Sequence, residues 1–166
     1  MRDVYIFLGG SSTNDMGIGM AEALGYEFRD RDGDEVPPVG LSLAFIMEIS
    51  SVLKYRKSDV RFYGVGDVTN PLYGKNGAAQ VYAAQKGADK YAIQILDKGL
   101  RKMSKRCRKF LNKDVAKIPG AGAAGGLGAG VMAFLDGDII PGIDFIKDKA
   151  NFDAVANDVD LSLIHI

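Results

Sequence analysis

The residues of this sequence best suited to bind a phosphate or a carboxylate group lie in a polar, glycine-bearing turn near the N-terminus. The turn consists of Gly9, Gly10, Ser11, Ser12, Thr13, Asn14 and Asp15. Glycine lets the backbone approach a ligand closely, and the N–H groups at the start of a following helix attract anions. A plain helix cap needs only one of these five polar residues, so the run favours a binding site.

A second glycine-rich turn, residues 120–128, contains the GxGxxG pattern of dinucleotide-binding proteins. Its context differs from theirs, because Lys117-Ile118-Pro119 is not the buried strand that should lead into the pattern. Two interpretations stay open. The turn can hold a phosphate at a helix start, or it can allow tight helix packing through small residues. The glycines concerned are Gly120, Gly122, Gly125 and Gly126.

Three further polar residues can do chemistry. Asp67 and Asn70 follow a predicted strand, where α/β proteins place ligand groups. A carboxylate there can hold Mg²⁺ or accept a hydroxyl proton, and the alternative is a structural turn before Pro71. Lys86 can neutralise a phosphate, although a lone lysine at a helix end usually faces solvent.

The elements that must position these residues alternate between strand and helix, which predicts an α/β fold without an internal repeat or linker. We expect a parallel strand over 4–8, buried on both faces, and a second strand over 60–65. Hydrophobic spacing predicts helices over 16–24, 88–111 and 131–135. A short hairpin over 26–36, closed by Pro37-Pro38, and an irregular helix over 41–53 complete the prediction.

Composition excludes several classes of function. Lysine and arginine total 21 and so do the acidic residues, so no global field attracts nucleic acid or an anionic membrane. No apolar run approaches the ~20 residues of a membrane span. The single cysteine, Cys107, lies on the apolar side of a predicted helix and indicates a packed thiol. It also fits a reducing compartment, and we expect a cytoplasmic protein.

The last six residues, 161–166, read Leu-Ser-Leu-Ile-His-Ile and do not look like the end of a domain. One back-translation of them resembles the transposon end used to prepare sequencing libraries. We therefore expect the reading frame to run into adapter sequence after about Asp160; a native strand is the alternative. If so, His165 is foreign, and a Ser-His-Asp triad or a Cys-His pair is excluded.

Taken in order, the motifs resemble those of the bacterial glycerate kinase family, which phosphorylates D-glycerate with ATP. The matching segments are residues 9–19, 67–78, 85–88, 119–128 and 141–143. Departures from the family pattern are Met16, Gly66 and Ala83-Ala84, which bear on local geometry more than on the reaction class.

The resemblance implies that residues 1–160 are a partial glycerate kinase domain with both family ends missing. They would be the central slice of a two-domain α/β kinase with a flavodoxin-like domain. It implies phosphoryl transfer from MgATP to a hydroxyl of D-glycerate, with ATP and Mg²⁺ as cofactors and no nucleic acid or membrane partner. A non-catalytic phosphate- or nucleotide-binding module is the alternative.

On this hypothesis the two glycine turns bind the phosphates or the glycerate carboxylate. Asp67 is the base or the Mg²⁺ anchor, Asn70 orients the substrate, and Lys86 supplies positive charge. The oligomeric state and the choice between the 2- and 3-hydroxyl stay open.

Overall fold

The computed structural model of this chain describes residues 2–52, 59–161 and 163. The expected adapter stretch 161–166 falls outside these residues except for Leu161 and Leu163, and His165 is among those not described. None of the helices in the described part of the chain has the length and apolar character that crossing a membrane requires.

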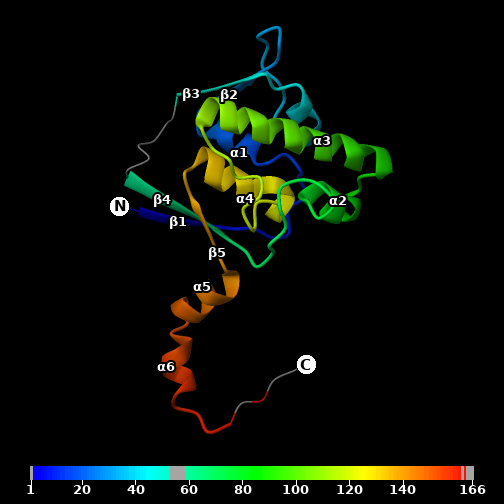
Figure 1. The fold of residues 1–166 in the computed structure, drawn as a ribbon. Helices are drawn as coiled ribbons and strands as arrows, with labels where there is room; N and C mark the ends of the chain where they lie inside the picture. Colours follow the sequence, from blue (N-terminus) through cyan, green and yellow to red (C-terminus); the bar gives the residue numbers. More distant parts are fainter. Residues whose placement is uncertain (1, 53–58, 162, 164–166) are drawn as a thin grey trace.

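A three-stranded parallel sheet confirms both predicted strands and the α/β class (Figure 1). Its strands are β1 (Arg2–Phe7), β4 (Val60–Val65) and β5 (Asp138–Ile140), in the order β1-β4-β5. Both pairings are parallel, so the carboxyl ends of all three strands lie at one edge. The segments that follow the strands therefore meet at that edge, where open α/β sheets bind ligands.

The prediction that β1 is buried on both faces is wrong, because Phe7 is 58% exposed. β1 stands at the end of the sheet order, and one face carries Ile6 against the hydrophobic core. On the other face Tyr5 packs against Phe145 of α5 (Gly142–Lys149), with ring centroids 4.7 Å apart. Phe145 also contacts Phe7, with ring centroids 5.4 Å apart, but this one contact leaves most of the Phe7 side chain exposed.

Helix α4 (Ala123–Phe134) lies between the sheet and the helices α1 (Ile18–Ala23) and α3 (Lys90–Arg106), as Figure 1 shows. Its sequence carries no charged residue, as expected of a helix buried on all sides. The side chains of Val131 and Phe134 are fully buried.

The remaining helical segments are short. Two of them lead into α3. After α3 the chain continues as a π-helical turn, and α3 with this turn makes up the predicted helix over 88–111. The two segments before α3 are α2 (Ala78–Tyr82) and η3 (Ala84–Lys86), and the π-helical turn after it is η4 (Cys107–Leu111). Cys107 is buried there, which confirms the packed thiol. Figure 1 shows α5 and α6 (Phe152–Ala156) continuing beyond β5, away from the other helices.

A second, antiparallel sheet replaces the predicted hairpin. Strand β2 (Tyr26–Arg29) pairs with β3 (Glu48–Ser51), while Arg29 and Glu35 form only an isolated bridge. The Val36 N–H still donates to Phe28 O at 3.1 Å, but Pro37 and Pro38 cannot extend this pairing, since proline has no N–H donor. The expected irregular helix over 41–53 is half correct: η1 (Gly40–Ala44) is a 3₁₀ helix, but β3 follows it.

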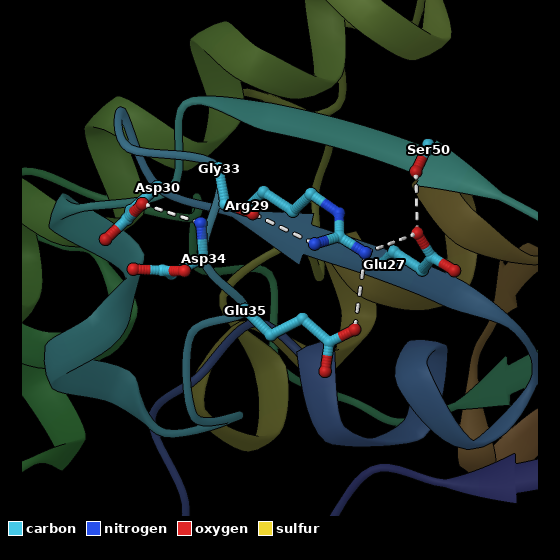
Figure 2. A network of polar contacts seen from close by, with 7 residues as sticks. All are labelled: Glu27, Arg29, Asp30, Gly33, Asp34, Glu35 and Ser50. Atoms are coloured by element: carbon cyan, nitrogen blue, oxygen red, sulfur yellow. Dashed lines mark hydrogen bonds and ion pairs between the residues drawn. The ribbon is translucent and has the colours of Figure 1, made fainter.

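Figure 2 shows how charge holds the turn after β2 in place. The Arg29 guanidinium donates hydrogen bonds to Gly33 O at 2.9 Å, to Glu27 Oε2 at 3.2 Å and to Glu35 Oε1 at 3.4 Å. The Asp34 N–H donates to Asp30 Oδ1 at 3.1 Å, which closes the turn from the other side. These groups are solvent-accessible, and their hydrogen bonds stabilise the turn.

Candidate functional site

A cavity of about 200 Å³ brings three of the predicted motifs together at the carboxyl edge of the parallel sheet. We call it the Lys86 cavity. Its walls come from the first turn, from the loop after β4, from the α2–η3 segment and from the second turn. They are Leu8, Gly9, Gly10, Ser11, Val68, Tyr82, Gln85, Lys86, Ala124 and Gly125.

Lys86 is the cationic group of this cavity. Its ammonium donates hydrogen bonds to Ser11 Oγ at 2.8 Å and to Thr13 O at 2.7 Å, so the side chain turns inward rather than into solvent. Lysine carries three N–H donors, and these two bonds use two of them. Burial lowers the pKa of Lys86 below its usual value, and the negative charge of Asp15 partly offsets this shift.

The backbone explains why Lys86 points inward. The 3₁₀ turn η3 ends at Gly87, whose φ of +93° is a left-handed conformation suited to glycine. This turn separates α2 from α3 and places the lysine between them. The neighbouring glutamine, Gln85, lines the same cavity.

The first turn divides into an open part and a buried part. Gly9 and Gly10 are exposed, and no atom lies within 4 Å of a Cβ placed on either one. Asp15 is buried, and its Oδ1 accepts a hydrogen bond from Gly17 N at 3.0 Å. The structure therefore places the start of the predicted site in the cavity wall and its end in the interior.

Three residues of the first turn stand apart from the cavity wall. Ser12 and Thr13 are exposed, and Thr13 contributes its carbonyl oxygen to Lys86. Asn14 is only 8% exposed, and neither polar atom of its amide has a hydrogen-bond partner within the described part of the chain. A buried amide without partners is costly and uncommon, which singles out this position.

The second turn packs against the first. A Cβ on Gly125 would meet Thr13 O and Asn14 Cα, and the Met16 N–H donates to Gly125 O at 3.2 Å. Ala124, Gly125 and Gly126 all have left-handed φ values, so regular helix geometry begins only after them. Ala124 and Gly125 face the cavity.

The other glycines of the second turn serve close packing. A Cβ on Gly122 would meet Pro71 O, one on Gly126 would lie 2.9 Å from a Leu72 side-chain carbon, and one on Gly120 would lie 3.0 Å from Ile139. These contacts fit the packing interpretation, and the phosphate-binding interpretation stays a prediction. Gly125 lines the cavity, while Gly120, Gly122 and Gly126 do not.

Asn70 does not line the Lys86 cavity but shapes one of its walls. Its Oδ1 accepts a hydrogen bond from the Tyr82 hydroxyl at 2.7 Å, and its Nδ2 donates to Asn76 O at 2.9 Å. Tyr82 lines the cavity, so Asn70 acts on the cavity through that ring. Nothing in the sequence pattern distinguishes Tyr82, because its place in the cavity wall depends on a hydrogen bond to a residue 12 positions away.

Asp67 lies outside the Lys86 cavity and lines a second cleft of about 510 Å³, which we call the Asp67 cleft. The two spaces share Val68, so Asp67 stands beside the boundary between them. Its Oδ1 accepts a hydrogen bond from Ile143 N at 3.1 Å, at the start of α5. The cleft is lined by Gly66, Asp67, Val68, Thr69, Ile118, Pro119, Met132, Asp138, Ile139 and Pro141.

No three histidine, cysteine or acidic side chains within the described residues are grouped so that they could hold a metal ion by themselves. Mg²⁺ rarely needs such a cage, because one or two carboxylates and the substrate phosphates commonly hold it. A single exposed carboxylate such as Asp67 fits that manner of binding.

Comparison with known proteins gives the same family from sequence and from structure. The model of the "Glycerate kinase family" matches residues 1–164. A glycerate kinase from Halalkalibacterium halodurans is 41% identical over 161 residues, covering 96% of this chain and 42% of that protein. Glycerate 2-kinase from Escherichia coli K12 is 41% identical over 160 residues, with coverages of 96% and 42%.

A solved structure agrees with these relatives. A crystal structure from Salmonella typhimurium LT2, assigned as glycerate kinase 2, aligns with a TM-score of 0.86 at 38% identity. The alignment covers 94% of this chain and 42% of that one. The chain thus spans well under half the length of the relatives that it matches.

Proposed function

The chain belongs to the glycerate kinase family, and we propose from this premise that its protein transfers the terminal phosphoryl group of ATP to D-glycerate. A glycerate hydroxyl oxygen bonds to phosphorus, the bond from phosphorus to the ADP oxygen breaks, and the hydroxyl proton leaves. The products are phosphoglycerate and ADP. The proposal includes a cytoplasmic location, in keeping with a single buried thiol.

The observation that carries this proposal is the convergence of Lys86, Ser11 and the Ala124-Gly125 turn on one small cavity. Phosphoryl transfer depends mainly on positioning the reactants and neutralising phosphate charge. A half-buried ammonium beside a hydroxyl and glycine-rich backbone supplies both. A volume of about 200 Å³ suits a phosphate group or a three-carbon acid.

Asp67 completes the proposed site as the base for the glycerate hydroxyl or as the anchor of Mg²⁺. Its place beside Val68, which borders both spaces, supports either role. When bound, Mg²⁺ would neutralise part of the charge on the phosphates. Asn70 holds Tyr82 in the cavity wall, so we assign it a positioning role toward the substrate.

The test is the release of ADP by the gene product expressed from its natural start codon to its natural stop codon. We expect release that requires both D-glycerate and Mg²⁺. Omitting each in turn gives the background rate of ATP hydrolysis. ³¹P spectra of the product would show which hydroxyl carries the phosphate.

The alternative is a non-catalytic module that binds phosphate or a nucleotide through the same turns. A folded protein that binds ATP but gives no glycerate-dependent ADP release would support that alternative and contradict the kinase proposal. Binding by itself does not separate the two, since both require an anion site.

A further inference from the structure

We propose that the nucleoside part of ATP binds in the Asp67 cleft, with the phosphates passing Val68 into the Lys86 cavity. The inference rests on the proposed function, since it divides one substrate between two adjoining spaces. Val68 lines both spaces, and both open at the carboxyl edge of the sheet.

Size separates the two spaces. The Lys86 cavity, at about 200 Å³, is smaller than the range of about 300–1,000 Å³ typical of pockets for drug-sized ligands. The Asp67 cleft, at about 510 Å³, falls within that range. A whole nucleoside triphosphate therefore needs more room than the Lys86 cavity offers, and the adjoining cleft provides it.

The charges that line the two spaces indicate which end of the nucleotide each space holds. The charged residues that line the Asp67 cleft are two carboxylates, Asp67 and Asp138, whereas Lys86 lines the other space. Two negative charges disfavour phosphate groups or the carboxylate of glycerate inside the cleft, so the phosphates meet Asp67 only at the boundary, where it would act on them through Mg²⁺ or on the glycerate hydroxyl. An uncharged base and sugar carry no such penalty, so the nucleoside occupies the cleft and the phosphates lie toward Lys86.

The walls of the cleft suit the flat apolar face of a purine. Ile118, Pro119, Met132, Ile139 and Pro141 line it, and Thr69 adds a hydroxyl. Ile118 is 40% exposed, as expected of a side chain that borders an open cleft. Ligand pockets generally combine such apolar walls with a few polar groups that fix orientation.

The experiment compares two probes, ADP and inorganic pyrophosphate, on the complete gene product by calorimetry. The variant is Ile118→Ser, which removes apolar surface from the cleft and leaves the charge unchanged. We expect its affinity for ADP to fall about five- to tenfold and its affinity for pyrophosphate to stay within about twofold. Leu41→Ser is the matched control, because Leu41 is 53% exposed and lies in η1, outside the cleft.

The outcomes separate this inference from the proposed function. Equal loss of ADP and pyrophosphate affinity in Ile118→Ser, or no loss of either, would overturn the inference. So would a wild-type protein that binds pyrophosphate as tightly as ADP. If ADP binding behaves as expected but glycerate causes no ADP release, the cleft assignment stands and the kinase proposal fails. Thermal unfolding of both variants confirms that they are folded.

Discussion

Lys86 Nζ lies 2.8 Å from Ser11 Oγ, and this hydrogen bond joins residues that are 75 positions apart in the chain. It closes the Lys86 cavity between the turn after β1 and the segment before α3. Burying an ammonium costs free energy, which the hydrogen bonds offset in part. A phosphate that approached this ammonium would meet a charge that is already oriented.

The first prediction removes that charge. Lys86→Met keeps most of the side-chain volume, and we expect kcat/KM for the kinase reaction to fall about 10²- to 10³-fold, the usual cost of losing one stabilising donor. Lys90→Met is the control, since Lys90 is exposed in the first turn of α3. Steady-state kinetics in both substrates would check this result. Near wild-type kcat/KM in Lys86→Met would remove the lysine from the site.

The second prediction concerns the packing between the two glycine turns. Gly125 has φ +71°, and an added Cβ would lie only 2.8 Å from Asn14 Cα. We expect Gly125→Ala to lower the free energy of unfolding by about 3 kcal/mol or more, from left-handed strain plus overpacking. Urea denaturation would measure the loss.

The control for that variant separates backbone strain from contact. Gly33 has φ +88°, but no atom lies within 4 Å of a Cβ added at this position. Gly33→Ala therefore carries the strain alone, and we expect a loss of about 1 kcal/mol. Equal losses in the two variants would contradict the packing argument.

The sequence predicts two of the three strands of the parallel sheet because their signal is local, whereas the three-residue strand β5 was missed. Residues 4–8 form a continuous apolar run, and residues 60–65 are apolar apart from Arg61 and Gly64. Each segment is followed by glycine, and such segments indicate strands in a parallel sheet. The pairing of β2 with β3 was missed because the partners lie far apart in sequence, and no local pattern encodes that pairing. The Asp32-Gly33 turn signal favoured a hairpin instead.

For the site, residue type was predictable but placement was not. Glycines, hydroxyls and Lys86 were recognisable from their types, and the structure brings several of them together. Asp67 was placed correctly at the strand end, yet its cleft depends on where the fold places the loop before α4, Met132 of α4 and strand β5. Tyr82 left no signal, because its contact with Asn70 exists only in the folded chain.

The third prediction is a pH dependence of stability. Burial raises the pKa of Cys107 to about 12 from 9.0, and burial with the charge of Asp136 raises that of Tyr26 to about 12 from 10.0. Above pH 9 the unfolded state therefore ionises more readily than the folded state. These two groups therefore lower stability as pH rises from 9 toward 12, by up to about 1.4 kcal/mol per pH unit for each group.

Two variants test whether Tyr26 and Cys107 cause the fall of stability at alkaline pH. Tyr26→Phe loses the hydroxyl that donates to Phe134 O at 2.8 Å, so we expect a cost of about 1 kcal/mol at pH 7 and a shallower fall at alkaline pH. Cys107→Ala should also reduce the slope, although its cavity lowers stability at every pH. Denaturation curves between pH 7 and 11 measure both. An unchanged slope in both variants would refute the assignment.

The last prediction concerns Asp67, the carboxylate beside the boundary of the two spaces. Asp67→Asn keeps an oxygen that can accept the hydrogen bond from Ile143 N, so we expect the start of α5 to stay intact. It removes the negative charge that a base or a Mg²⁺ anchor requires, and turnover should fall by about 10²- to 10⁴-fold. Asp144→Asn, which changes an exposed acid in the first turn of α5, should leave turnover unchanged.

Titration with Mg²⁺ separates the two roles proposed for Asp67. Loss of an anchor raises the Mg²⁺ concentration needed for half-maximal rate, whereas loss of a base lowers kcat at saturating Mg²⁺. Wild-type turnover in Asp67→Asn would exclude both roles and leave Asp67 as a structural acceptor for α5.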